Sequence, residues 1–224
     1  MKKIALIVGT RPEIIKVAPI YLEASSKFNF EIIATGQHSE MAQQAFSAFA
    51  IKPHINLNLM KADQSNLSLL SACITQLENL FRTQHYDGII VQGDTSSALA
   101  GALAAYHFKI PVAHLEAGLR TNNKFSPFPE EMNRSLISRI ADLHFCPTLK
   151  AKENLEREGF TENLYVTGNS VVDAVKIMQE KIATQAVQIN QSIVVLSKKF
   201  SSLVLVTGHR RENFGLLEEN LCKV

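Results

Sequence analysis

Residues 88–118 read GIIVQGDTSSALAGALAAYHFKIPVAHLEAG, and this stretch decides the fold. Its two apolar runs, Gly88–Val91 and Val112–Leu115, have the length and composition of buried strands. Between them, Ser96–Phe108 has the length and apolar periodicity of a helix. Two near-continuous apolar strands joined by a helix indicate a βαβ unit in a parallel sheet that is covered on both faces.

The same alternation of strands and helices extends in both directions from this unit. Further strands are predicted at Ile4–Val8, Phe30–Ala34, Leu143–Cys146, Leu164–Val166 and Leu203–Thr207. Further helices are predicted at Pro12–Ser25, Asn66–Arg82, Glu130–Ile140 and Lys150–Glu158. The sequence therefore predicts an α/β fold with a doubly wound, Rossmann-like parallel sheet.

The order of these segments predicts three parts. Residues 1–170 hold the alternation and are expected to form a first Rossmann-like domain, and residues 171–200 are expected to form a helical connection. Residues 201–224 contain a fresh strand and the start of another helix, as at the opening of a second Rossmann-like domain. Because so short a segment has too little apolar surface to close a second sheet, we expect the sequence to be a piece of a longer chain.

Composition argues against several classes of protein. The formal net charge is +2 without blocks of like charge, so bulk attraction to nucleic acid or to an acidic membrane is not expected. The three cysteines show no CxxC spacing, which argues against a disulfide framework and a zinc site. The apolar run Ile4–Val8 is too short for a signal peptide, and no stretch reaches the roughly 18 residues of a membrane helix. We expect a cytoplasmic protein.

Nearly every predicted strand ends in a polar, glycine-containing or charged cluster. These clusters are Gly9–Glu13, Thr35–His38, Gln92–Thr95, His114–Thr121, Thr167–Ser170 and Gly208–Asn213. The carboxyl ends of parallel strands lie along one edge of the sheet, where ligands bind. We therefore expect a composite ligand site built from several of these clusters.

The first cluster has the features of an anion site. Pro12 suits the first position of a helix, and Gly9 lets backbone amides approach a ligand at that helix N-terminus. Arg11 adds a forked donor and Lys16 adds a point charge, a pairing suited to phosphate oxygens. Alternatively, Arg11 and Lys16 are solvated helix charges. With Gly9 as its only glycine, the turn is neither a dinucleotide-binding GxGxxG fingerprint nor a Walker A loop.

Four carboxylates stand at strand or helix ends, namely Asp94, Glu116 and the pair Glu130 and Glu131. Carboxylates in a partly dry cleft can have raised pKa values and can act as general acid or base. Structural alternatives remain open for three of them, because Asp94 could cap the following helix and Glu130 or Glu131 could satisfy a helix dipole. For Glu116, which lies between two apolar neighbours, a purely structural role is harder to find.

The histidines suggest phosphate contact more than metal binding. His209 follows the last predicted strand beside Arg210, where its ring could contact a leaving phosphate. His38, His114 and His209 come from different strand ends and lack the i, i+4 spacing of a helical metal site, so we predict no metal. His144 lies within an apolar strand and is expected to be a core residue.

Several ordered motifs together resemble those of one enzyme family. These motifs are Gly9–Glu13 with Lys16, Gln92–Thr95, His114–Thr121, Pro127–Arg134, Thr167–Asn169 and Gly208–Asn213. They resemble the non-hydrolysing UDP-N-acetylglucosamine 2-epimerases, whose fold is similar to that of glycosyltransferases with two Rossmann domains. The resemblance implies that the sugar nucleotide binds between two domains, of which this chain would supply the first and the opening of the second.

The resemblance also implies a reaction and roles for individual residues. A base removes the proton at C2 as UDP leaves C1, which gives a 2-acetamidoglucal, and re-addition on the other face gives UDP-N-acetylmannosamine, a precursor for cell-envelope polysaccharide. At the positions that match the family's motifs, the proton carriers would be Asp94, Glu116 and Glu130. The groups around the phosphates would be Arg11, Lys16 and a catalytic His209. No cofactor is implied. The sequence does not say which acid serves which face of C2.

Two alternatives to this activity remain open at this point. A hydrolysing relative would release N-acetylmannosamine and UDP, and a catalytically incomplete fragment would only bind UDP-N-acetylglucosamine or UDP. Some family members are regulated by a second substrate molecule, and Gln37 and His38 fit that region. A homodimer is expected, without a nucleic-acid or membrane partner.

Overall fold

The computed structural model describes residues 1–36, 40–59, 61, 64–184 and 190–204. The chain divides into two compact units, Met1–Lys181 and Ile182–Val224. Gln37, His38 and His209 lie outside the described residues.

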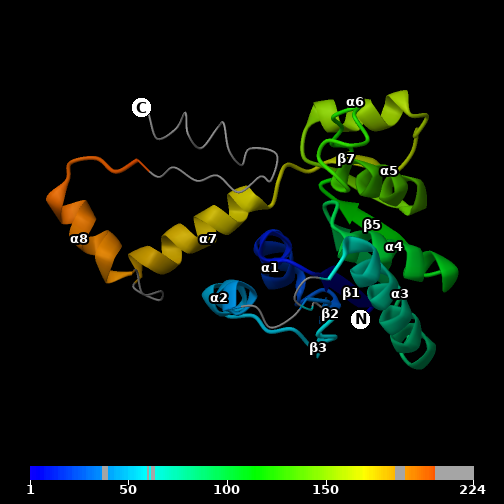
Figure 1. The fold of residues 1–224 in the computed structure, drawn as a ribbon, viewed down its shortest axis with the longest axis horizontal. Coiled ribbons are helices and arrows are strands. Elements are labelled where there is room, and N and C mark those ends of the chain that lie inside the picture. The colour runs from blue at the N-terminus through cyan, green and yellow to red at the C-terminus, as the bar shows by residue number, and fades with distance from the viewer. Residues whose placement is uncertain (37–39, 60, 62–63, 185–189, 205–224) are drawn as a thin grey trace. The chain divides into compact units, whose positions relative to one another are not determined.

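The described part of the first unit contains a seven-stranded sheet in which all paired strands are parallel (Figure 1). Its strands are β1 (Lys3–Val8), β2 (Asn29–Ala34), β3 (Ile55–Asn56), β4 (Gly88–Gln92), β5 (Val112–Leu115), β6 (Leu143–Cys146) and β7 (Leu164–Val166). They lie in the order β3-β2-β1-β4-β5-β6-β7. The predicted doubly wound α/β fold is confirmed.

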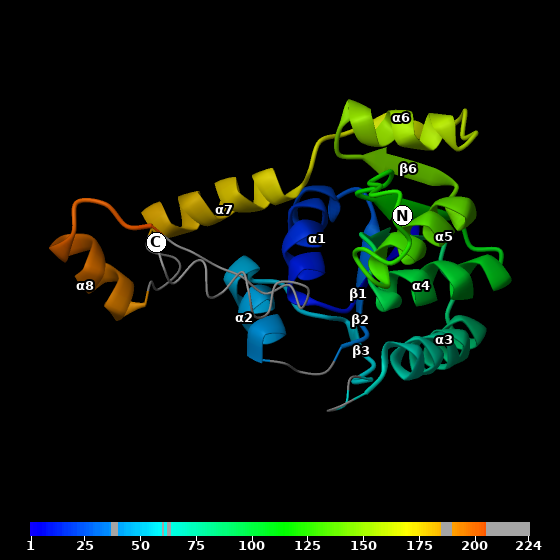
Figure 2. The ribbon, with the colours of Figure 1, turned by 45° about the horizontal axis from the view of Figure 1, so that its top comes forward.

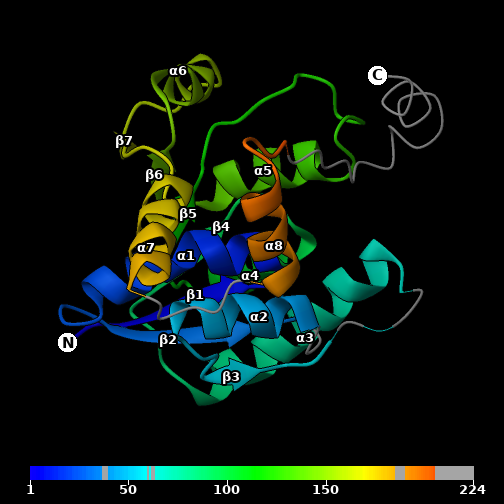
Figure 3. The same cartoon turned by 90° about the vertical axis from the view of Figure 1, so that its left-hand side faces the viewer.

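The helices are α1 (Arg11–Ala24), α2 (Glu40–Phe49), α3 (Asn66–Thr83), α4 (Ser96–His107), α5 (Glu130–Ile140), α6 (Leu149–Arg157), α7 (Val171–Ala183) and α8 (Gln191–Lys199). Figures 2 and 3 show α1 and α2 on one face of the sheet and α3 and α4 on the other. The chain winds outward from β1 to β3 and then from β4 to β7, so the winding direction changes between β1 and β4. Ligands of open α/β sheets bind at such a switch point.

The two faces of the sheet carry separate cores because side chains alternate along each strand. In β1, Ala5 and Ile7 belong to the core shared with α3 and α4, while Leu6 and Val8 belong to the core shared with α1 and α2. Helix α4 packs directly on the sheet because its buried face consists largely of small residues. A side chain at Gly101 would run into Ile7 and Val91.

The structure adds two elements that the pattern did not predict, α2 and β3. The helical stretch Val171–Lys199 is interrupted, since α7 ends at Ala183 and α8 begins at Gln191. Leu203 and Val204 are not in a strand, and the rest of the predicted strand Leu203–Thr207 lies outside the described residues. The predicted division into parts 1–170, 171–200 and 201–224 stays a prediction. Among the helices described, none is long and apolar enough to cross a bilayer.

Candidate active site

Glu116 is the centre of a polar cluster at the carboxyl edge of the sheet. Its Oε2 accepts hydrogen bonds from Lys16 Nζ at 2.5 Å and from Gln92 Nε2 at 2.6 Å. Its Oε1 accepts a hydrogen bond from Asn169 Nδ2 at 2.8 Å. Glu116 directly follows β5, and its three partners come from α1, β4 and the loop after β7, so the folded sheet brings together groups that are far apart in the sequence. Glu116 is therefore held in one orientation by three donors.

The backbone at Glu116 is unusual for a residue with a side chain. Its φ is +64°, in the left-handed region that non-glycine residues rarely occupy. Two residues later, Gly118 has φ +85°, and a side chain there would collide with the Ala151 carbonyl at the start of α6. The chain after β5 thus turns sharply to bring Glu116 over the sheet edge, and backbone outliers of this kind cluster at functional sites.

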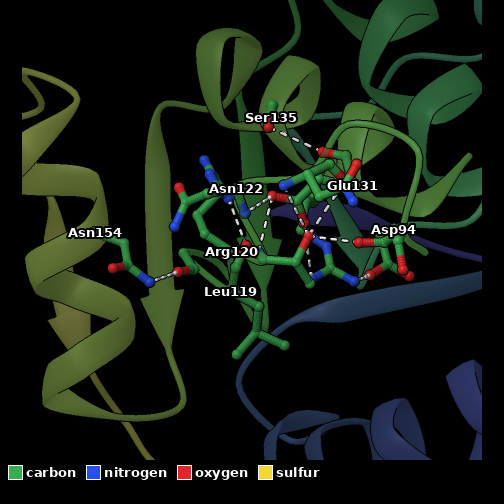
Figure 4. Close-up of polar contacts among 12 residues, drawn as sticks. Asp94, Leu119, Arg120, Asn122, Glu131, Ser135 and Asn154 are labelled. Atoms are coloured by element: carbon green, nitrogen blue, oxygen red, sulfur yellow. Dashed lines mark hydrogen bonds and ion pairs between the residues drawn. The ribbon is translucent and has the colours of Figure 1, made fainter. Parts of the chain in front are cut away.

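Asp94 follows the neighbouring strand β4 and is held from α5. Its carboxylate forms an ion pair with the Arg134 guanidinium, and Asn133 Nδ2 donates to its backbone carbonyl at 2.8 Å (Figure 4). Burial raises the pKa of Asp94, while the charge of Arg134 acts in the opposite direction. The alternative that Asp94 caps α4 is wrong, because Thr95 is the N-cap and accepts from Ala98 N at 3.1 Å.

The two acids that open α5 differ in surroundings. Glu131 is buried, and its Oε1 accepts from the backbone N–H groups of Thr121 and Asn122 at 2.9 and 3.0 Å (Figure 4). It therefore fixes the loop after β5. Glu130 is half-buried, and its charge contributes to the raised pKa of Asp94, so these two carboxylates lie close enough to repel each other.

Arg11 and Lys16, both predicted at a phosphate site, lie in different surroundings. Arg11 is the first residue of α1 and is exposed. Lys16, one turn further along α1, is partly buried by its pairing with Glu116. The turn thus leaves one cation open to a ligand and directs the other to a carboxylate.

The described histidines near the site are buried, and burial favours their neutral form. His114 shares a hydrogen bond of 2.7 Å between its Nε2 and the Gly93 carbonyl oxygen, in which the ring must donate. Burial lowers the pKa of His114 to about 4 and also lowers that of His144. His144 packs against Phe160 with ring centroids 5.1 Å apart, which confirms the expected core position. Within the described residues, no group of three or more His, Cys, Asp or Glu side chains could hold a metal ion.

Several contacts of this site are not predicted by the sequence. The strand-end clusters contain Gln92 and Asn169 but assign them no role, and in the structure both donate to Glu116. For Arg134, the sequence contains one indication of a place in the site. It lies four residues after Glu130, and positions i and i+4 share a helix face. The contacts of Gln92 and Asn169 with Glu116 join loops from different strands, and the sequence contains no comparable indication of them.

A cavity of about 620 Å³ opens beside this cluster, within the size range of small-molecule sites. Lys16, Gln92, Glu116 and Asn169 are among its lining residues at the carboxyl edge, and apolar side chains such as Phe145 line it along the sheet. Of the candidate carboxylates and cations, Glu116 and Lys16 line this cavity, whereas Asp94, Glu130 and Arg11 are not among its lining residues.

Comparisons with known proteins agree on one family. A family model described as UDP-N-acetylglucosamine 2-epimerase matches residues 21–224. The UDP-N-acetylglucosamine 2-epimerase of Bacillus subtilis (strain 168) is 42% identical over 99% of this chain and 57% of its own length. The chain thus spans less than two thirds of this curated relative.

Solved structures are similar as well. The crystal structure of UDP-GlcNAc 2-epimerase from Neisseria meningitidis bound to UDP-GlcNAc has a TM-score of 0.85 and 39% identity, over 95% of this chain and 58% of that one. The Methanocaldococcus jannaschii enzyme in complex with UDP-GlcNAc and UDP has a TM-score of 0.77 and 36% identity, over 88% and 53%.

Proposed function

Because the chain belongs to the UDP-N-acetylglucosamine 2-epimerase family, we propose that its sheet edge carries active-site residues of an enzyme that interconverts UDP-N-acetylglucosamine and UDP-N-acetylmannosamine. The observation that carries this proposal is the pair of carboxylates, Asp94 and Glu116, which follow adjacent strands and are each paired with a cation. Glu116 also lines the cavity. The relatives named above support the substrate class.

The proposed chemistry is elimination followed by re-addition. C2 of the sugar has no adjacent carbonyl, so simple removal of its proton to an enolate is not available. Instead, a base takes the C2 proton, the C1–O bond breaks with its electron pair on UDP, and a C1=C2 double bond forms in 2-acetamidoglucal. UDP oxygen then adds back to C1 while a proton is delivered to C2 on the opposite face. This sequence needs an acid, a base and cations near the leaving diphosphate.

The described residues have the types that these roles require. Asp94, with a pKa raised by burial, and Glu116, oriented by its donors, are proposed to handle protons together with Glu130. Carboxylates in contrasting environments are a common basis for dividing acid and base roles. Arg11 and Lys16 are proposed to act near the diphosphate. His209, and the proposed regulatory residues Gln37 and His38, remain predictions.

Product analysis tests this function against hydrolysis and against binding alone. Protein expressed from the gene through its natural stop codon is incubated with UDP-N-acetylglucosamine, and the anomeric protons are followed by NMR. The proposal expects UDP-N-acetylmannosamine as product. Free N-acetylmannosamine with UDP would indicate a hydrolysing enzyme, and unchanged substrate would leave only a binding role.

We further propose that the reaction needs no added metal or nicotinamide. The chain's glycine pattern lacks a dinucleotide fingerprint, and the elimination route requires no oxidation. Epimerisation should continue at an unchanged rate after dialysis against EDTA. A rate that collapses and then recovers on addition of a divalent cation would contradict this. The expected homodimer and cytoplasmic location stay predictions, and light scattering can test the first.

A further inference from the structure

Beneath the site lies a buried carboxylate to which the proposed chemistry assigns no role. Glu13 on α1 is only 1% exposed. Its Oε2 accepts from Gly9 N at 3.1 Å, Thr10 N at 2.6 Å and Thr10 Oγ1 at 2.7 Å. Its Oε1 accepts from Thr95 Oγ1 at 2.8 Å, across 82 positions of sequence. Glu13 therefore joins the turn after β1 to the turn after β4.

A capping box explains only half of this arrangement. The bonds from Thr10 satisfy the first turn of α1 in the usual way of a Thr and a Glu three residues later. The bond from Thr95 is not part of that capping box, because Thr95 is the N-cap of a different helix, α4. Burial of a carboxylate is costly, and it raises the pKa of Glu13. A cap alone could be formed by an exposed side chain without this cost.

A second buried contact ties the same turns together. Thr35, after β2, and Ser97, on α4, have their hydroxyl oxygens 2.7 Å apart. Gly9 packs so closely on this pair that a side chain at position 9 would collide with Ser97. The turns after β1, β2 and β4 are thus joined by side-chain contacts directly under the carboxyl edge.

These contacts stand next to residues of the proposed reaction. Arg11 directly follows Thr10, and Asp94 directly precedes Thr95. We propose that Glu13 is a positioning residue, an inference that rests on the proposed function. Through its bond with Thr95, Glu13 fixes the turn that carries Arg11 relative to the turn that carries Asp94. Catalytic groups must be held within a fraction of an ångström, and a displacement of about 1 Å can cost about 100-fold in rate.

The chain offers a matched control for this link. Thr95 accepts from Ala98 N at 3.1 Å to cap α4, and Thr148 accepts from Ala151 N at 3.1 Å to cap α6. Thr95→Val removes a cap and the bond to Glu13, while Thr148→Val removes a cap alone. Both variants should lose free energy of unfolding in denaturant titration, and Thr95→Val should lose more because it also removes a hydrogen bond to a buried carboxylate. A rate difference between them then reports the bond to Glu13.

The decisive readout is the epimerisation rate of the protein expressed through its natural stop codon. Thr95→Val should lower kcat about 10-fold or more with a much smaller change in KM, whereas Thr148→Val should stay within about twofold of wild type. Thr95→Ser, which keeps the hydroxyl, should restore most of the rate. Equal rates in Thr95→Val and Thr148→Val would overturn the inference.

A second variant separates Glu13 from any direct role of Thr95. Glu13→Gln keeps the size of the side chain but replaces an accepting oxygen by an amide. If both substitutions break the same link, the losses in kcat for Glu13→Gln and Thr95→Val should not add in the double variant. Fully additive losses would show that Thr95 acts without Glu13 and would overturn the inference. An inactive wild type would instead refute the proposed function itself.

Discussion

At the scale of single residues, two carboxylates on adjacent strands have contrasting surroundings. Glu116 accepts hydrogen bonds from three side chains, whereas Asp94 is paired with one arginine and repelled by Glu130. Contrasting environments separate the tasks of two otherwise similar acids. The raised pKa of Asp94 results from burial, and Arg134 limits the rise.

Removing the proton carriers should reduce the chemical step. We expect Asp94→Asn, Glu116→Gln and Glu130→Gln each to lower kcat about 100-fold or more, with a small change in substrate affinity, because shape is kept and proton transfer is lost. Stopped reactions in wild type and variants, compared at saturating substrate, measure the effect. A variant that keeps the normal rate would show that its carboxylate has a structural role only.

Buried Glu13 should make the stability of the fold depend on pH. Burial raises the pKa of Glu13 in the folded protein above its ordinary value of 4.5, so above that pH the unfolded chain loses this proton more readily than the folded one. Wild-type stability should therefore fall as pH rises from about 4.5 through the folded pKa of Glu13, relative to Glu13→Gln. Denaturant titrations of both proteins across this range measure the difference. A difference independent of pH would contradict the raised pKa.

At the scale of elements, the turn before α7 combines a local side-chain contact with a contact to the site. Asn169 Oδ1 accepts from Val171 N at 3.0 Å, and its Nδ2 donates to Glu116. Asn190, the N-cap of α8, makes a similar local contact, with Oδ1 accepting from Ser192 N at 2.9 Å. The two asparagines make matching local contacts, and Asn169 adds the bond to Glu116.

This pair separates the local contact from the orientation of Glu116. Asn169→Asp keeps an oxygen for the bond from Val171 N but replaces the donor to Glu116 by a carboxylate. The value of kcat should fall about 10-fold or more, because a hydrogen bond to a charged group is lost and two carboxylates then repel each other. Asn190→Asp keeps its cap and should leave kcat unchanged. Steady-state rates of the two variants measure this, and the account fails if they are equal.

The elements differ in how well the sequence predicts them. Long apolar runs such as Gly88–Val91 carry a clear signal, and the strands and helices around them were predicted correctly. β3 has only two residues, too few for any periodicity, and α2 is a short helix that the pattern missed. The break before α8 has only a weak signal, the N-cap residue Asn190, because residues 184–190 contain neither glycine nor proline.

The sequence predicts where the site lies but not the contacts within it. Parallel strands place their carboxyl ends at one edge, so the sequence could indicate that Asp94 and Glu116 lie there. It could not show that Lys16 pairs with Glu116 rather than remaining open, because that contact joins groups 100 positions apart. The ion pair between Arg134 and Asp94 is likewise set by the packing of α5 against the β4 turn.

At the scale of the whole molecule, the position of the site follows from the topology. The winding direction of the sheet changes between β1 and β4, and the turns after these strands carry Arg11 and Asp94. Buried contacts from Glu13 and Thr35 join these turns from below. The relatives that share this fold include enzymes solved with UDP-GlcNAc and UDP.

In the proposed reaction, the proton at C2 is removed and replaced. This is tested by epimerisation of UDP-N-acetylglucosamine in D₂O by the protein expressed through its natural stop codon, with deuterium at C2 followed by NMR. We expect UDP-N-acetylmannosamine that carries deuterium at C2, with exchange slowed about 100-fold or more in Glu116→Gln or Asp94→Asn. Product that retains its original C2 proton would contradict it.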